Sequence, residues 1–361
     1  MQVAFFPSVE VYGDNPYWQI LKNGLEQAGV EFCQTSDRLY LQWRWLVQNR
    51  SHVKVLHFHH LRHHYAVNDR CASYKSLVKF AAKLTLARLL GYRVVWTMHN
   101  LQPHERLKPE RVFHLTNWVM AQLANSVIVH CTYAQQALGS HYGRRRRVIV
   151  IEHPNYIDAY PNAISRDQAR RTLGISSTQK VFLFLGAIRP YKGVEQLVQV
   201  FGQLERADLK LLVVGKMWDK DLEIQLERLA AMDGRIDIYP DYVPDKALQI
   251  YFNAADAVVL PYSEVLSSGS ALLAMSFGCP VIAPKIGCLK EVITENSGIL
   301  YDESDPQALF EALKASLQVN LERLGSGAYS RAREFTWMQM VDRTLLAYGR
   351  KGSQSLEVLS S

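Results

Sequence analysis

The sequence lacks any uninterrupted apolar run of the roughly 18–20 residues that a membrane-spanning helix needs. Its first ten residues, MQVAFFPSVE, show no basic region followed by a long apolar core, so no secretory signal is expected. Cysteine is scarce, since the five cysteines are scattered and no two form a CxxC pair. This pattern argues against a disulfide framework and a structural zinc site. These absences predict a cytoplasmic protein.

Extremes of composition are missing as well. Hydrophobic residues make up 48% and charged residues 21% of the chain, close to the averages for globular proteins, which excludes a disordered, collagen-like or coiled-coil chain. No repeat of solenoid period is present. A length of 361 residues therefore predicts two compact domains.

Positive charge is concentrated in the first part of the chain. Positions 1–160 contain 19 of the 41 Lys and Arg residues but only 10 of the 34 Asp and Glu residues, so this part carries +9 and the remainder −2. Such asymmetry predicts a polyanionic partner for the first part. The candidates are nucleic acid, an anionic membrane surface and a phosphorylated substrate.

Short β-rich runs alternate with helix-like stretches in both halves, which predicts an α/β fold of two doubly wound domains facing a central cleft. We expect an N-terminal domain over residues 1–160 and a second domain over 161–340. The remaining residues 341–361 should form a C-terminal helix and tail that pack back on the first domain. The predicted strands are 3–6, 53–58, 93–98, 126–130 and 147–151, then 181–185, 209–214, 236–239, 257–260 and 281–283.

Two loops of the second half suit an anion. The first, GAIRPYKG at 186–193, follows a predicted strand and carries Arg189 and Lys192, which suit a phosphate or are merely solvated charges on a turn. The second loop runs into a predicted helix and offers hydroxyls, a glycine and helix-start amides; its candidate residues are Ser267, Ser268, Gly269 and Ser270. The alternative for that loop is a serine cap without a ligand. Together the two loops predict a diphosphate site.

These motifs resemble the group 1 glycosyltransferases. The resemblance rests on GAIRPYKG, on YVPDKALQIYFNAADAVVLPY at 242–262 and on SGSALLAMSFGCPVIA at 268–283, in this order. It implies the GT-B fold, a first domain that binds the acceptor, a second domain that binds a nucleotide-sugar, and no metal ion or other cofactor. Base and ribose recognition is expected around Tyr239, Tyr242 and Val243.

One motif departs from the family pattern. Retaining members carry two glutamates eight positions apart, the second directly before AlaMet, but this sequence has Leu273 there. Glu264 corresponds to the first glutamate with a shift of one position. Whether the reaction retains or inverts the anomeric centre therefore stays open.

Looser matches in the first half supply further candidates. A histidine after the third major strand contacts the donor sugar in the resembling family, which implies that role for His99. Glu105 is a candidate general base, and Glu264 a candidate for donor-sugar hydroxyls. On the acceptor side the candidates are Gly13, Asp14, Asn15, Tyr17 and His59. The histidines near position 60 lack the spacing of a metal site, so no metal is expected.

A basic amphipathic stretch at 75–91 favours an anionic membrane surface as partner, through Lys75, Lys79, Lys83 and Arg88. Packing against a sheet with solvated lysines is the alternative. We expect a peripheral protein at the inner face of the cell membrane.

The sequence thus predicts a hexosyltransferase that moves a sugar from a UDP- or GDP-linked donor to a saccharide or lipid-linked saccharide, as in exopolysaccharide or surface-glycan synthesis. A noncatalytic nucleotide-sugar-binding protein or a sugar-nucleotide epimerase on the same fold is the alternative. Nucleic-acid binding is the least favoured, because RNA-stacking platforms and helix-turn-helix spacing are absent.

Overall fold

The computed structural model describes residues 1–12, 15–35, 37, 39–68, 70–101, 107–217 and 219–350. Two compact units make up the chain. Unit 1 is Met1–Glu152 with Thr336–Ser361, and unit 2 is His153–Phe335. Three candidate site residues, Gly13, Asp14 and Glu105, lie outside the described residues.

Unit 1 is built on a parallel six-stranded sheet with the order β2-β1-β3-β4-β5-β6. The three central strands are almost entirely buried, because helices cover both faces and the strands therefore consist of apolar runs. The strands are β1 (Gln2–Phe6), β2 (Glu31–Phe32), β3 (Val53–Phe58), β4 (Arg93–Thr97), β5 (Ser126–Val129) and β6 (Val148–Val150).

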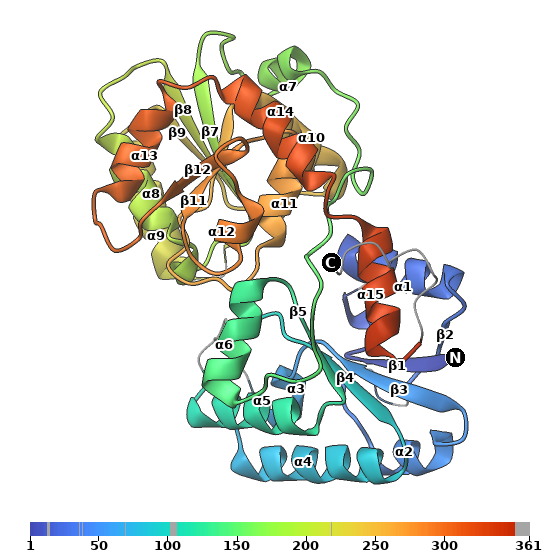
Figure 1. Ribbon diagram of the computed structural model, residues 1–361. Helices are drawn as coiled ribbons and strands as arrows, with labels where there is room; N and C mark the ends of the chain where they lie inside the picture. The colour runs from blue at the N-terminus through green and yellow to red at the C-terminus, as the bar shows by residue number, and fades with distance from the viewer. Residues whose placement is uncertain are drawn as a thin grey trace. The chain divides into compact units, whose positions relative to one another are not determined.

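The helices of unit 1 lie on both faces of this sheet, with α4 and α5 on one face and α1 and α15 on the other (Figure 1). Phe80 of α4 packs on Phe58 at the end of β3. The helices are α1 (Pro16–Gln27), α2 (Trp43–Asn49), α3 (Arg62–Tyr65), α4 (Tyr74–Leu89), α5 (Arg111–Leu123), α6 (Thr132–Tyr142) and α15 (Trp337–Ala347), with a 3₁₀ turn at Val9–Tyr12.

The last helix, α15, belongs to unit 1. It packs on α1 at Gly24, where an added Cβ would lie 2.6 Å from Val341 Cγ2, so only glycine lets the two helices approach this closely. Just beyond α15, the Tyr348 hydroxyl lies 2.7 Å from His57 Nδ1 in the core. The C-terminal helix thus completes one face of the first sheet.

Unit 2 repeats the architecture with a parallel sheet of order β12-β11-β10-β7-β8-β9. The strand order places β7 beside β10, although more than 70 residues separate them in the chain. The strands are β7 (Lys180–Leu185), β8 (Leu209–Val214), β9 (Ile236–Tyr239), β10 (Ala257–Val259), β11 (Val281–Pro284) and β12 (Gly298–Tyr301).

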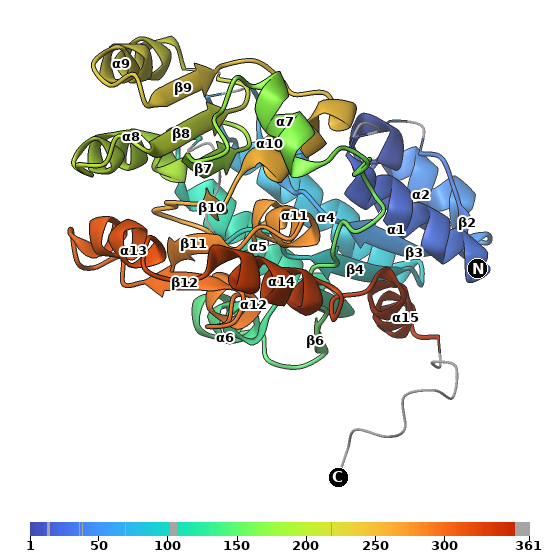
Figure 2. The same ribbon diagram turned by 90° about the horizontal axis from the view of Figure 1, so that it is seen from above.

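In unit 2, helices α8, α9 and α13 lie on one face of the sheet and α10, α11 and α14 on the other (Figure 2). The helices are α7 (Arg166–Thr172), α8 (Val194–Gly202), α9 (Lys220–Ala231), α10 (Leu248–Ala254), α11 (Gly269–Ser276), α12 (Leu289–Val292), α13 (Ala308–Ser316) and α14 (Leu321–Ala332), with 3₁₀ turns at Pro190–Lys192 and Asp245–Ala247.

The predicted α/β fold of two doubly wound sheets is confirmed, and each predicted strand is present to within two residues at either end. Two edge strands were not predicted: β2 is too short for a periodic signal, and β12 is only partly buried. The chain passes from unit 1 to unit 2 at 152/153, whereas the sequence predicts the boundary after residue 160. The reason is that Asn155 donates to the carbonyls of Ala332 and Phe335, which ties residues from 153 onward to unit 2.

Candidate functional site

The two loops predicted to bind phosphate lie against each other in unit 2. They follow the neighbouring strands β7 and β10 at the carboxyl edge of the sheet. The backbone N–H of Ser263 donates to the Tyr191 carbonyl over 3.0 Å. Gly193 has a φ of +68°, and an added Cβ there would lie 1.9 Å from the Pro261 carbonyl oxygen. A side chain at 193 would therefore separate the loops.

Lys192 lies directly over a buried tyrosine of the other loop. Its Nζ is 4.0 Å from the ring centroid of Tyr262, which is only 2% exposed. Burial by itself raises the pKa of Tyr262. The positive charge of Lys192 lowers that pKa, and so do the hydrogen bonds that the Tyr262 side chain makes with Ser270, Ser268 and Lys192. Together these effects outweigh burial, and the pKa is lowered. The Lys192 ammonium and two of the predicted serines thus lie around the Tyr262 hydroxyl.

Sequence reasoning did not name Tyr262 as a site residue, although it ends the quoted motif at 242–262. The signal was a large aromatic residue three positions after a buried strand, where a loop leads to a helix. Because its contacts come from Lys192, 70 residues away, only the folded chain reveals them.

The start of α11 supplies the amides of this site. The Ser268 side chain caps the helix by accepting from the Ala271 N–H over 3.2 Å. The cap and the anion site are therefore compatible, since the amides of Gly269 and Ser270, at the first two helical positions, have no acceptor within the helix itself. An added Cβ at Gly186 would lie 3.6 Å from Ser270 Oγ, so the two loops also meet here.

Two further side chains of unit 2 point at the first residue of α11. An added Cβ at Gly269 would lie 3.3 Å from the Tyr156 hydroxyl and 3.6 Å from His153 Nε2. Tyr156 is anchored because its backbone N–H donates to Ser276 Oγ over 2.9 Å, and burial raises its pKa. Neither residue was among the candidates predicted from the sequence.

Arg189 and Lys192 occupy one loop, and the charge of each opposes the burial that raises the pKa of the neighbouring Tyr191. Arg189 and Ser267 are half-buried.

Glu264, the candidate for donor-sugar hydroxyls, is exposed on the second loop. Leu273, the residue in place of the family's second glutamate, is half-buried on α11 and offers no acceptor for a ribose hydroxyl.

The residues predicted for base and ribose lie at the end of β9, which is at the same edge of the sheet as the two loops. The Tyr239 carbonyl accepts from Gly215, and an added Cβ at Gly215 would lie 1.9 Å from the Gly186 carbonyl oxygen. Val243 is half-buried, while Tyr242 is 63% exposed. The backbone thus connects this region to the phosphate loops.

In unit 1, His59 and His99 follow β3 and β4 at the carboxyl edge of the sheet. His59 Nδ1 lies 3.2 Å from His99 Nε2. His59 and Tyr17 are buried, and His99 is half-buried. Asn15 caps α1 by accepting from the Tyr17 N–H over 3.0 Å. The described part of the chain contains no cluster of three or more His, Cys, Asp or Glu side chains suited to a metal ion.

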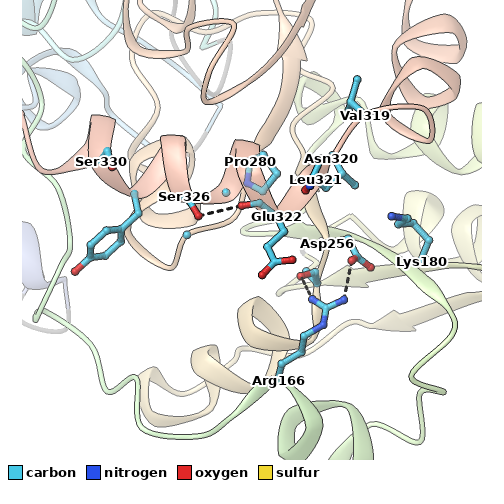
Figure 3. Close-up of a pocket in the computed structure, with 14 residues that line it drawn as sticks. Arg166, Lys180, Asp256, Pro280, Val319, Asn320, Leu321, Glu322, Ser326 and Ser330 are labelled. Carbon is cyan, nitrogen blue, oxygen red and sulfur yellow. Dashed lines mark hydrogen bonds and ion pairs between the residues drawn. The ribbon is translucent and has the colours of Figure 1, made fainter.

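A hollow of about 840 Å³ lies at the opposite edge of the second sheet, where the strands begin. Lys180, which starts β7, and Pro280, which precedes β11, line this hollow (Figure 3). Because the phosphate loops follow the ends of their strands, the hollow is separate from them. Asp256 in its wall accepts from Arg166 over 2.7 Å and from Arg170 over 2.9 Å. These ion pairs fasten α7 to the sheet, and we assign the hollow a structural role.

Comparison with protein families gives a match over residues 165–331 to the family described as glycosyl transferases group 1. A D-inositol 3-phosphate glycosyltransferase of Geodermatophilus obscurus is 30% identical over 62% of this chain and 52% of its own length. A GDP-mannose:glycolipid 4-beta-D-mannosyltransferase of Xanthomonas campestris pv. campestris is 28% identical over 72% of this chain and 67% of its own. The chain thus spans about half of the first relative.

Solved structures show the same fold at low identity. Sucrose-phosphate synthase of Thermosynechococcus elongatus superposes with a TM-score of 0.74 at 17% identity, over 97% of this chain and 98% of that chain. Anabaena HepE in complex with UDP-glucose superposes with a TM-score of 0.71 at 18% identity, over 96% and 100%. These superpositions confirm the predicted GT-B fold, and the family match over residues 165–331 confirms the resemblance for that part of the chain.

Proposed function

We propose that this chain, residues 165–331 of which match the group 1 glycosyl transferases, is a hexosyltransferase with a UDP- or GDP-linked donor. The acceptor is a saccharide or a lipid-linked saccharide of surface-glycan synthesis. The observation that carries the proposal is the cluster in unit 2 of Lys192, Tyr262, Ser268 and Ser270 at the start of α11. Relatives named for an inositol phosphate, for GDP-mannose and for a glycolipid support this substrate class.

The chemistry of sugar transfer explains why such a cluster is needed. Cleavage of the bond between sugar and diphosphate leaves positive charge at the anomeric carbon and negative charge on the departing diphosphate. In this proposal Arg189, Lys192 and the amides at the start of α11 neutralise the leaving group, which the position of Lys192 beside the second loop supports. We further propose that these groups take the leaving-group charge in place of a metal ion. An unchanged transfer rate in the presence of EDTA would support this.

The donor class can be tested by thermal unfolding with UDP, GDP, ADP and their sugars. A ligand at 100 times its dissociation constant stabilises the folded state by about 2.7 kcal/mol, so the preferred nucleotide should raise the melting temperature clearly. Adenosine and uridine without phosphates should not, because the cluster recognises the diphosphate. If no nucleoside diphosphate or its sugar shifted the transition, the donor site would be refuted. Donor binding without sugar transfer would favour the noncatalytic alternative.

We also propose that the protein acts at the inner face of the cell membrane, with the exposed face of α4 on the lipid. Cations at Lys75 and Lys79 alternate there with exposed apolar side chains, and Val78 is 66% and Leu89 80% exposed. Lys83 is half-buried, so its side chain is less accessible to the lipid than those of Lys75 and Lys79. None of the described helices is both long enough and apolar enough to cross a bilayer.

Vesicle sedimentation tests this face of α4. Each basic residue at an anionic surface contributes about 1 kcal/mol, so the double variant Lys75→Glu/Lys79→Glu should bind phosphatidylserine vesicles at least ~30-fold more weakly at low salt. The matched control is Lys220→Glu/Lys314→Glu, which changes net charge equally at exposed positions of unit 2. Equal losses in both variants would show that total charge, and not α4, governs binding.

A further inference from the structure

Three histidines form a line along the carboxyl edge of the unit 1 sheet. His59, His99 and His130 follow β3, β4 and β5, which are neighbours in that sheet. His59 Nδ1 lies 3.2 Å from His99 Nε2, and His99 Nδ1 lies 3.4 Å from His130 Nε2. The far nitrogen of His130, Nδ1, lies 2.9 Å from the Ile151 carbonyl oxygen. Adjacent imidazoles are thus hydrogen-bonded through both nitrogens of the middle ring.

The Ile151 carbonyl fixes the proton at the end of this line. A carbonyl oxygen can only accept, so His130 Nδ1 carries a proton. His130 is buried, and burial lowers its pKa although the bond to Ile151 and the charge of Glu152 oppose the effect. A neutral His130 has an unprotonated Nε2, which can only accept a hydrogen bond, so the donor is the Nδ1–H of His99. The proton of a neutral His99 therefore belongs on Nδ1.

His59, at the other end of the line, supports the same tautomer of His99. His59 is 2% exposed between Trp18 and Phe5, and burial lowers its pKa well below the ordinary value. Its Nε2 is buried and has no hydrogen-bond partner among the described residues. Orphaned buried N–H groups are rarer than orphaned acceptors, so the single proton of His59 belongs on Nδ1, where it is donated to His99 Nε2.

We propose that His59 and His130 are positioning residues for His99, holding its ring from both sides and fixing it as the neutral Nδ1–H tautomer. All three hydrogen bonds then run in one direction, from His59 through His99 and His130 to Ile151. The catalytic part of this inference rests on the proposed function and on the contact with the donor sugar that the family resemblance implies for His99. Both nitrogens of His99 are then engaged by the neighbouring imidazoles. The ring therefore presents its carbon edge to the sugar in one orientation, without a charge that would oppose the developing positive charge.

Histidine-selective ¹⁵N and ¹³C NMR of the full chain at pH 7 tests the tautomer directly, with His99→Gln used for assignment. The wild type should show His99 as a single Nδ1–H species. His130→Asn keeps a donor for Ile151 but offers no acceptor toward His99, so the signals should become a mixture of tautomers. His130→Gln places an amide oxygen near the former Nε2 and should restore the Nδ1–H form. His59→Asn keeps a donor near the former Nδ1 and should leave the tautomer unchanged.

Sugar transfer provides the second measurement. In His130→Asn, kcat should fall about tenfold or more while the KM for the donor stays within about twofold, and His130→Gln should recover most of the rate. An imidazolium or an Nε2–H His99 in the wild type would overturn the proposal. So would an unchanged tautomer in His130→Asn. Because NMR needs no turnover, failure of the proposed sugar transfer would be recognised separately as a wild type without activity.

Discussion

Lys192→Ala should abolish the thermal stabilisation that the preferred nucleoside diphosphate gives to the wild type. The Lys192 ammonium is held over the Tyr262 ring at 4.0 Å, and the Tyr262 side chain also hydrogen-bonds to Ser268 and Ser270, so the cation is already held at the loop that we propose for the anion. Loss of one such preorganised cation costs about 3–4 kcal/mol of charge stabilisation, or roughly 10²–10³-fold in transfer rate. Donor binding, measured by calorimetry, should weaken by at least ~100-fold.

The matched control for this prediction is Lys220→Ala, which removes a highly exposed lysine from α9 of the same unit. Its nucleotide affinity and its melting temperature should equal those of the wild type. Lys192→Arg should bind more weakly than the wild type, because the larger planar guanidinium does not reproduce the compact point charge of the ammonium. A correctly folded Lys192→Ala protein that binds the diphosphate with wild-type affinity would remove Lys192 from the site.

Asp256→Ala should strongly lower the free energy of unfolding of unit 2. Asp256 accepts hydrogen bonds from Arg166, from Arg170 and from the Val181 N–H at the start of β7. The Arg170 side chain is only 3% exposed, so the substitution leaves a buried guanidinium without its carboxylate. Removal of one partner from a buried ion pair costs about 3–5 kcal/mol. At 2–4 °C per kcal/mol, the unfolding transition of unit 2 should fall by roughly 10 °C.

The exposed pair Arg206–Asp208 provides the control for Asp256. Asp208→Ala should change the melting temperature little, because water already screens an exposed pair. Residual folded Asp256→Ala protein should still bind the nucleotide, since Asp256 lies at the edge of the sheet where the strands begin and the phosphate loops lie where they end. A melting temperature equal to that of the wild type would show that the carbonyls around Arg170 are sufficient partners for it.

Much of the candidate site could be predicted because it is local in sequence. Arg189 and Lys192 lie within one loop, and Ser267, Ser268 and Gly269 within another, each directly after a strand that consists of apolar residues. Loop composition and the position before a helix are enough to suggest an anion site in both cases. Their roles in donor binding stay predictions until the nucleotide measurements are made.

The residues that sequence reasoning missed are those whose partners are distant in the chain. Tyr262 is recognised as a site residue only through its contact with Lys192. Tyr156 is recognised only through its position beside Gly269, which lies more than 100 residues further on. His130 is unremarkable in the sequence, whereas the structure bonds it to His99. None of these pairs has a fixed spacing that a motif could encode.

The alternation of strands and helices is encoded locally, since buried parallel strands must be apolar runs and covering helices must be amphipathic. The positions of cations and hydroxyls in the loops are encoded locally as well. The strand order, which places β7 beside β10 and β4 between β3 and β5, arises only in the folded chain. Side chains from distant segments meet only through that order, because each strand hydrogen-bonds to neighbours that local sequence does not specify.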